Sequence, residues 1–369
     1  VCTAIVPSLA SDRAEIRGVW LTNVDSDILF SRANLEAGID RLHEFHFNTI
    51  YPTVWQGGYT LYPSEVAREA IGRSRYPEPG LQGRDMLQEA VELARDRGMR
   101  ILPWFEFGFM APADSELVRR HPHWLTQTID NTVIKMQGVL PRVWLNPFYP
   151  EVQEFILDLV TEIVSNYDID GIQFDDHFSL PSEFGYDLYT KYLYRREHNG
   201  QQPPENSDDP EWIRWRADKI TEFVDRVFAT IKQHCPTCTV SVSPNPQHWA
   251  YPVYLQDWET WERRGYIEEL ILQVYRPELD RFVRELEYAE VEAARSHIPV
   301  GIGILAGLRD RPTDIELVRS KVEAVRDRGF AGVSFFFYET LWIGTEPTRE
   351  RESVLSQLFA TPVESPSLR

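Results

Sequence analysis

The sequence predicts an α/β protein, a (β/α)₈ TIM barrel with extended loops after several strands. Short apolar runs rich in β-branched and aromatic residues alternate with longer helical patterns, which is the order that parallel βαβ units produce. There are eight such runs, and eight parallel strands with intervening helices close into a barrel. The alternative is an open doubly wound sheet, but no G-x-G-x-x-G motif follows the first run.

The first half of the chain contains four predicted strands. They cover residues 16–21, 49–55, 100–106 and 171–176. The helical patterns between them cover residues 35–46, 85–97 and 150–167, and Gly98 is expected to cap the second of these helices. The sequence between the third strand and its helix is irregular around residues 121–124 and 144–147.

The second half contains the other four strands. They are expected at residues 239–243, 270–275, 300–304 and 332–337, with the last helix between strands at residues 313–329. A long insertion precedes them, with its main helix at residues 210–234 and a polar, proline-rich loop at residues 201–210. The resulting division is an N-terminal extension (1–14), a barrel (15–345) with a helical insertion around residues 178–235, and a C-terminal helix and tail (346–369).

Charge and composition exclude several classes of function. The 369 residues carry a formal net charge of −19, which disfavours nucleic acid and anionic membranes as partners. No stretch of 18 apolar residues is present, so no membrane span is expected. Aromatic residues make up 12% of the chain, which suits core packing and also a cleft that stacks on sugar rings.

The first residue is Val1, so we expect a processed or engineered end from which a targeting signal was removed. The three cysteines are Cys2, Cys235 and Cys238. The last two are spaced for a small disulfide or for no bond at all, and two thiols alone do not make a zinc site.

Polar residues gather at the predicted carboxyl ends of the strands, where barrels carry their active sites. Because side chains alternate along a strand, Gln173 and Asp175 should face the barrel interior, with Asp175 at the mouth and Asp176 opening the loop. The same alternation selects Trp104 and Glu106 on the third strand. On the other strands it selects Asn23, Trp55, Ser241, Ser243, Asn245, Gln273, Tyr275, Ser334, Phe336 and Tyr338, with Glu339 just beyond the last strand.

These residue types fit glycoside hydrolysis. The chain contains no zinc-protease, serine-hydrolase or P-loop motif, which leaves carboxylates, amides and aromatic residues. One carboxylic acid protonates the leaving oxygen, and a second carboxylate attacks the sugar or activates water. The candidates are Asp175, Asp176, Glu106 and Glu339, with Glu183 behind them. Other interpretations remain open: the Asp–Asp pair as a helix cap or a divalent-cation ligand, and Glu106 as the partner of an arginine.

Several blocks, taken in order, resemble the glycosyl-hydrolase-10-like bacterial family. They are residues 15–20 (EIRGVW), 47–50 (FNTI), 59–64 (YTLYPS), 98–107 (GMRILPWFEF), 143–147 (VWLNP), 167–176 (YDIDGIQFDD), 212–216 (WIRWR), 241–244 (SVSP), 261–267 (WERRGYI), 273–275 (QVY) and 301–303 (GIG). The likeness covers residues 15–345. Each block is weak alone, but the ordered set is specific.

The resemblance implies a TIM barrel, export in many members, and glycosidase activity, in some relatives on peptidoglycan strands stripped of their peptides. The family's Asp-Gly-Ile-x-Phe-Asp-Asp motif falls on residues 170–176, and its Gln-x-Tyr motif falls on Gln273 and Tyr275. The chain departs from the family pattern at His177, where a tyrosine is usual, and also at Leu272, Leu102 and Asn245. These changes lie beside the expected cleft and leave the substrate open.

The leading hypothesis is an exported glycosidase that acts on a bacterial polysaccharide, with Asp175 as nucleophile or base and Glu106, Asp176 or Glu339 as acid. The expected stacking platforms are Trp55, Trp104, Trp144 and Tyr275. The other expected substrate contacts are Asn23, His177, Asn245, Gln273 and Tyr338. No cofactor or metal is expected. The alternatives are a non-catalytic glycan-binding barrel and a metal-assisted barrel hydrolase.

Overall fold

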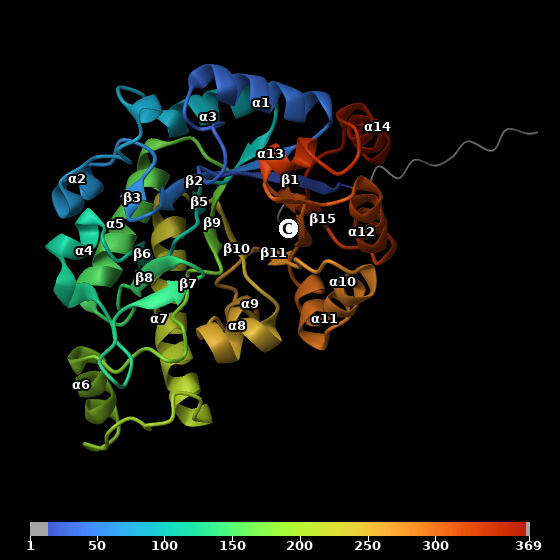
Figure 1. Ribbon diagram of the computed structural model, residues 1–369. Helices are drawn as coiled ribbons and strands as arrows, with labels where there is room; N and C mark the ends of the chain where they lie inside the picture. Colours follow the sequence, from blue (N-terminus) through green and yellow to red (C-terminus); the bar gives the residue numbers. More distant parts are fainter. Residues whose placement is uncertain (1–13, 367–369) are drawn as a thin grey trace, which may run out of the picture.

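The computed structural model describes residues 14–366, and within them eight parallel strand positions close into a barrel surrounded by helices (Figure 1). The fold prediction is confirmed. Around the barrel the order is β1 (Ile16–Leu21), β15 (Gly332–Phe336), β12 (Val300–Leu305), β11 (Glu269–Gln273), β10 (Thr239–Ser243), β9 (Gly171–Asp175), β5 (Trp104–Phe105) and β2 (Thr49–Gln56), and β2 pairs with β1 to close the ring.

The third strand position is split, because β4 (Arg100–Ile101) and β5 are separated by Leu102 and Pro103. Both pieces pair with β2. Proline has no N–H to donate to a neighbouring strand, which explains the break in the hydrogen-bond ladder.

The helices between the strands form the outer layer. They are α1 (Arg32–Glu44), α3 (Met86–Asp96), α5 (Pro150–Asn166), α7 (Pro210–His234), α9 (Trp258–Arg263), α10 (Leu279–Leu286), α11 (Ala289–Arg295), α12 (Ile315–Asp327) and, after the last strand, α14 (Thr348–Leu358). The side chain of Asp85 caps α3 at its start, accepting from the backbone N–H of Gln88. At its end the cap residue is Arg97, and Gly98 follows with a φ of 64°, so the predicted glycine acts one position later.

The connections at the carboxyl ends of the strands are long. A tight turn through Gly57 and Gly58 joins β2 to β3 (Tyr59–Thr60). The region predicted as irregular forms an antiparallel sheet of β6 (Met110–Pro112), β8 (Leu140–Trp144) and β7 (Lys135–Gln137). The remaining short elements are α2 (Glu65–Ile71), α4 (Glu116–Arg120), α6 (Leu188–Glu197), α8 (Gln247–Tyr254), α13 (Tyr338–Trp342), β13 (Gly307–Leu308), β14 (Arg311–Pro312) and two 3₁₀ turns, Pro79–Leu81 and Pro122–Trp124.

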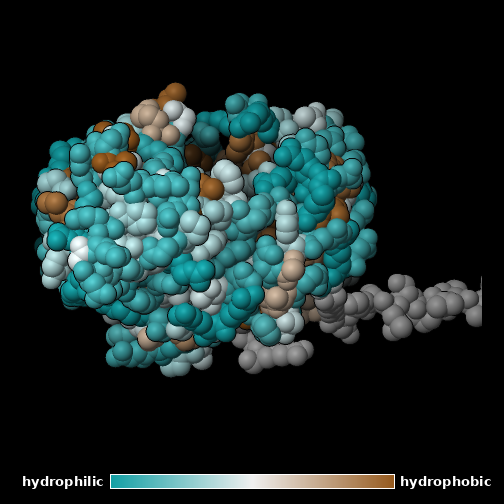
Figure 2. Space-filling view, turned by 90° about the horizontal axis from the view of Figure 1, so that it is seen from below, coloured by the Kyte–Doolittle hydropathy of each residue, from teal (hydrophilic) through white to brown (hydrophobic). Residues whose placement is uncertain are grey.

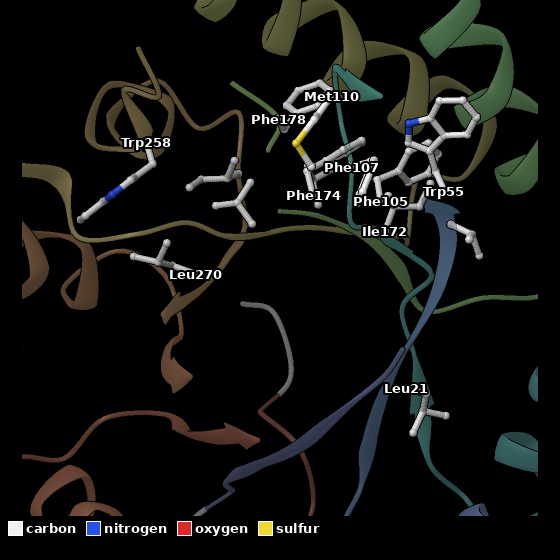
Figure 3. Close-up of a cluster of buried hydrophobic side chains, with 14 of the residues drawn as sticks. Leu21, Trp55, Phe105, Phe107, Met110, Ile172, Phe174, Phe178, Trp258 and Leu270 are labelled. Carbon is white, nitrogen blue, oxygen red and sulfur yellow. The ribbon is translucent and has the colours of Figure 1, made fainter. Parts of the chain in front are cut away.

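Two hydrophobic cores hold the layers together. The inner core fills the barrel and contains Trp20, Tyr51 and Trp104, with the Trp20 ring centroid 5.3 Å from that of Tyr51 and 6.1 Å from that of Trp104. The larger outer core lies between the strands and the helices, and Figure 3 shows part of it, including Phe105, Phe174 and Phe178. The inner core also contains polar side chains, among them Gln173, which accepts from Trp20 Nε1 at 2.7 Å and donates to Ser241 Oγ at 3.1 Å.

The C-terminal segment 361–365 lies across the amino ends of the strands. Arg17 donates to the carbonyl of Thr361 at 2.7 Å, and the backbone N–H of Glu15 donates to that of Glu364 at 2.9 Å. Arg100 donates to Ser365 Oγ at 3.0 Å. This end of the barrel is therefore partly covered by the chain itself, and a cavity of about 820 Å³ remains beside the segment.

The structure also bears on the cysteines and on the membrane prediction. Cys235 and Cys238 form a disulfide just after α7, whereas Cys2 and nearly all of the N-terminal extension lie outside the described residues. None of the described helices is both long and apolar enough to cross a bilayer.

Candidate active site

The carboxyl ends of the strands face the viewer in Figure 1, and this face lies uppermost in Figure 2, where it is hollowed. Hydrophobic side chains are visible inside the hollow between hydrophilic walls (Figure 2). The polar residues predicted from strand alternation end at this face, which places the candidate site in a partly apolar depression. Such surroundings suit the apolar faces and polar edges of sugar rings.

Asp175 is the last residue of β9 and is held by neighbours on the next two strands. Its Oδ1 accepts from Ser243 Oγ of β10 at 3.1 Å and from Gln273 Nε2 of β11 at 2.6 Å. Its backbone carbonyl accepts from Gln256 Nε2 at 2.9 Å. The side chain is buried and points into the barrel mouth, as the alternation predicts, so its position is fixed by three parts of the chain.

Asp176 and His177 follow Asp175 in the same turn. Asn245 Nδ2 donates to Asp176 Oδ2 at 2.7 Å. The Nδ1 atom of His177 lies 3.3 Å from Asp175 Oδ2 and 3.3 Å from Asp176 Oδ1. The Asp176 side chain is 25% exposed against 5% for that of Asp175, so the two adjacent carboxylates have different surroundings.

Glu106 directly follows β5, the strand next to β9. It is 9% exposed, and Thr53 Oγ1 donates to its Oε2 at a long 3.4 Å. Burial raises the pKa of Glu106 to about 7, although the charge of His177 and the hydrogen bond from Thr53 act to lower it. Glu106 therefore retains its proton over a wider pH range than an ordinary glutamate.

The Asp–Asp–His cluster shows the same competition between burial and charge. Burial, and after it the negative charge of Asp176, raises the pKa of Asp175 well above its ordinary value. Burial alone would lower the pKa of His177, but Asp176, Asp175 and Glu106 together raise it to about 9. Burial and the same three carboxyl groups raise the pKa of Tyr275, so its hydroxyl stays protonated.

The geometry favours this hydrogen-bonded acid cluster over a cation site. Atoms of Asp175, Asp176 and His177 that can bind a metal lie within 4.8 Å of one another. His177 Nδ1, the ring nitrogen that faces both aspartates, also lies 3.0 Å from the backbone carbonyl oxygen of Glu106. Because a carbonyl oxygen only accepts, Nδ1 carries the proton and offers no lone pair to a metal.

Several of the residues predicted to bind substrate do lie around Asp175 and Asp176. Asn245 and Gln273 contact Asp176 and Asp175 directly. Tyr275 stacks on Phe336, with ring centroids 5.9 Å apart, and is partly exposed. Trp104 lies beneath Phe336 in the inner core and is only 2% exposed, so it forms part of the floor and presents no open face to a sugar.

Three predicted stacking or binding residues face away from the site. Trp55 lies in the outer core against Phe155 of α5, and its Nε1 donates to the carbonyl of Gly108 (Figure 3). A shift of register between Thr53 and Trp55 breaks the alternation of β2, which explains the error. Trp144 is buried on β8 beside Phe184.

Tyr338 was predicted to face the barrel mouth, and this prediction is wrong for a related reason. The last strand ends at Phe336, and Tyr338 already begins α13, so the alternation no longer applies. Its ring lies close to Gly38 of α1 and 6.0 Å from that of Trp342, in the helix layer.

Glu339 and Asn23 lie on the β1 and β15 side of the mouth. Glu339 Oε1 accepts from Ser26, and Asn23 Nδ2 donates to Gln56 at 3.0 Å. Within residues 14–366, no hydrogen bond or ion pair joins Glu339 to Asp175 or Asp176. Burial raises the pKa of Glu339 as it does that of Glu106, but only Glu106 lies close enough to His177 and Asp176 for their charges to act on it.

Sequence reasoning missed four residues around the cluster. Arg142 of β8 lies with its guanidinium carbon 5.1 Å from the ring centroid of Phe107, and its charge acts on Glu106. Gln256 supports Asp175 from the loop after α8. Trp249 and Tyr254 of α8 have ring centroids 6.5 Å apart, and Trp249 is 49% exposed.

Part of this set was detectable in the sequence. Trp249 follows the predicted site residue Asn245 by four positions, so a turn or helix after β10 keeps it near the mouth. Arg142 belongs to an antiparallel hairpin that the strand and helix pattern did not predict, and its proximity to Glu106 arises only in the folded chain.

Residues 15–322 match the family model described as Glycosyl hydrolase-like 10. The chain is 26% identical over 300 residues to glycosyl hydrolase DigH of Escherichia coli O6:H1, covering 71% of this chain and 66% of DigH. It is 25% identical over 263 residues to glycosyl hydrolase YngK of Bacillus subtilis, covering 65% of this chain and 47% of YngK. The match thus spans less than two thirds of either relative's length.

Solved structures show the same architecture. The glycoside hydrolase domain of PgaB (BpsB) from Bordetella bronchiseptica aligns with a TM-score of 0.69 at 14% identity, over 94% of this chain and 99% of that domain. The catalytic domain of a β-amylase from Paenibacillus polymyxa aligns with a TM-score of 0.63 at 9% identity, over 94% and 99%. At these identities the likeness is one of fold.

Proposed function

The chain belongs to the glycosyl hydrolase-like 10 family, and from this premise we propose that it is a glycoside hydrolase that cleaves O-glycosidic bonds of a polysaccharide. The observation that carries the proposal is the meeting of Glu106, Asp175 and Asp176 at one barrel mouth, joined through His177. Glycoside hydrolysis needs two carboxyl groups in different protonation states on either side of one bond.

We assign the role of acid to Glu106. Burial raises its pKa to about 7, so a useful fraction of its side chain is protonated at neutral pH and can donate to the leaving oxygen. As the bond between the anomeric carbon and that oxygen breaks, the proton passes to the oxygen and the leaving sugar departs as an alcohol.

We assign the role of nucleophile or base to Asp175, whose ionised form is opposed by burial and by Asp176 and favoured by the neighbouring His177. The hydrogen bonds from Ser243 and Gln273 hold its Oδ1 in place, and its Oδ2 is directed toward His177. Asp176 is more exposed and is oriented by Asn245, which suits contact with a sugar or with the water that completes hydrolysis. Both aspartates thus belong to the reacting centre, with separate tasks.

The side chains around the barrel mouth indicate the class of substrate. Tyr275, Tyr254 and Trp249 supply aromatic faces, and Asn245 supplies an amide at the cleft. These groups suit a neutral or weakly charged glycan. The family resemblance suggests the glycan strands of peptidoglycan as the first substrate to test, and an extracellular or periplasmic location for the reaction.

The test is to incubate the protein with purified peptidoglycan strands stripped of their peptides and to identify the products by mass spectrometry. We expect Asp175→Asn to lower kcat by roughly 10²–10⁴-fold while leaving sugar binding and folding intact. Asp168→Asn is the matched control, because Asp168 is an exposed aspartate near the amino end of the same strand.

The possible outcomes distinguish an error in the proposed activity from an error in the proposed substrate. Full activity in Asp175→Asn contradicts the assignment of the catalytic centre. If the wild-type protein leaves these strands intact but cleaves another polysaccharide, the activity stands and the peptidoglycan assignment is wrong. No cleavage across a broad panel of polysaccharides contradicts the proposed activity itself.

A further inference from the structure

His177 has an unusual set of neighbours for one ring nitrogen. Its Nδ1 lies 3.0 Å from the backbone carbonyl oxygen of Glu106, 3.3 Å from Asp175 Oδ2 and 3.3 Å from Asp176 Oδ1. The first acceptor belongs to the third strand position of the barrel and the other two to the fourth. One imidazole nitrogen therefore connects two strands and two carboxylates.

This geometry fixes the location of one proton. A backbone carbonyl has no hydrogen to give, so Nδ1 is the donor in the 3.0 Å contact with the Glu106 carbonyl oxygen. The alternative tautomer, with a lone pair on Nδ1, would place that lone pair against oxygen lone pairs at hydrogen-bonding distance. The contact with the Glu106 carbonyl therefore favours the forms of His177 that carry a proton on Nδ1.

The other ring nitrogen is available for a ligand. Among the described residues, Nε2 of His177 has no hydrogen-bond partner, and it is absent from the polar atoms that are buried without one. The side chain is 24% exposed. Nε2 therefore reaches the open side of the ring, in the same mouth that holds Asp176.

The charges around the ring favour its doubly protonated form. The facing groups are Asp175 at the end of β9, Asp176 in the turn after it, and Glu106 just after β5. The positive charge of Arg142 on β8 acts on Glu106. Tyr275, just after β11, lies near the same three carboxyl groups, and Tyr254 of α8 lies near Asp176. Their combined effect outweighs burial and raises the pKa of His177 to about 9.

We propose that His177 is a positioning residue that is present as an imidazolium, with Nδ1–H holding the Asp175–Asp176 pair against the third strand and Nε2–H offered to the sugar. The contact between Nε2 and the sugar rests on the proposed function. The protonation state and the tether to the aspartates stand independently of any substrate.

The imidazolium is tested without substrate, by NMR of protein labelled with ¹⁵N-histidine. The His177 signals are assigned by their loss in His177→Asn. We expect both ring nitrogens of His177 to stay protonated past pH 8, and the midpoint to fall by at least one pH unit in Asp176→Asn. A His177 that titrates near 6.5, or that is insensitive to Asp176→Asn, would overturn the proposal.

Two variants separate the roles of the two nitrogens. The amide nitrogen of asparagine superposes on Nδ1, and that of glutamine falls near Nε2. We expect His177→Asn to keep the tether, retaining kcat within about tenfold and raising KM, whereas His177→Leu loses the tether and lowers kcat by roughly 10²-fold or more. His123→Asn is the control, because His123 pairs with Glu151 on the surface, away from the barrel mouth.

The variants also distinguish the two proposals from each other. Equal kcat in His177→Asn and His177→Leu would show that Nδ1 positions nothing, and would overturn the tether even if the enzyme is a glycosidase. An imidazolium by NMR in a protein that cleaves no glycan would leave the tether standing and contradict the proposed function.

Discussion

At the scale of single residues, three carboxyl groups lie in one mouth but experience different surroundings. Glu106 is buried with one weak hydrogen bond, Asp175 is buried with two hydrogen-bond donors on its Oδ1, and Asp176 is partly exposed. Burial penalises the charged form and raises the pKa of both Glu106 and Asp175, while the charge of His177 acts to lower both. A carboxyl group that keeps its proton near neutral pH, as Glu106 does, is what a general acid requires.

The first consequence is a pH dependence assigned to Glu106. Because burial raises its pKa to about 7 and the acid has to hold a proton, we expect kcat to fall as pH rises through about 7. Glu106→Gln should lower kcat for natural glycans by roughly 10²–10⁴-fold and lose this alkaline limb. Aryl glycosides with good leaving groups should be much less affected, since they need little protonation.

The same shift predicts a change in stability of known sign. The folded-state pKa of Glu106 lies above the unfolded value of 4.5, so its contribution to stability is complete below pH 4.5 and is lost as pH rises through about 7. Urea unfolding at pH 5 and pH 8 should therefore show a smaller loss of stability in Glu106→Gln than in the wild type. An identical loss in both proteins would contradict the raised pKa, and Glu44→Gln on the exposed surface of α1 is the control.

At the scale of elements, helix α7 supports the loop that follows the aspartate pair. Arg216 of α7 is fully buried, and among residues 14–366 no carboxylate lies at hydrogen-bonding distance from it. Its guanidinium donates to the carbonyls of Ser182 and Phe184, and to that of Ser207 at 2.8 Å. It also lies 4.4 Å from the ring centroid of Trp212. One side chain thus joins both ends of the segment between β9 and α7.

We expect Arg216→Met to destabilise the protein by about 3 kcal/mol, because several buried carbonyl groups lose their donor together. The loss is read from urea or thermal unfolding. Arg214→Met is the matched control on the same helix, since Arg214 is exposed and its replacement should change stability by about 0.5 kcal/mol or less. Equal effects of the two substitutions would show that Arg216 does not organise the loop.

At the scale of the whole molecule, the two ends of the barrel have different tasks. The carboxyl ends of the strands carry the acid cluster, whereas the amino ends are covered by residues 361–365. A buried pair between Arg100 and Glu269, 3.0 Å apart, lies at that covered end. The amino end of the barrel therefore contributes to the stability of the fold, and the loops at the carboxyl ends of the strands do not share that task.

Removal of residues 360–369 tests this division. It deletes the hydrogen bonds that Arg17, Asn48 and Arg100 make to the segment, so we expect a loss of about 2–4 kcal/mol in the free energy of unfolding. The kcat of the remaining folded enzyme should be unchanged within about twofold, because the segment lies at the far end from Asp175. A large fall in kcat at a temperature where the truncated protein stays folded would refute the division.

The sequence by itself determined the barrel, the strand that carries Asp175, and the mouth as the place of the chemistry. These features depend on the local periodicity of apolar residues and on the rule that parallel strands present their carboxyl ends together, both of which a single chain displays. The five helices whose bounds were predicted lie within a few residues of α1, α3, α5, α7 and α12, because the apolar pattern and the caps are local.

Only the tertiary structure decided which side chains share the mouth. Trp55 turned into the outer core because β2 shifts its register, and Glu339 stayed with Ser26 on the far side of the mouth. Arg142 reached Glu106 from a hairpin, and His177 met the Glu106 carbonyl across two strands. Such contacts join residues that are distant in sequence, and they depend on strand register and loop paths that alternation alone does not encode.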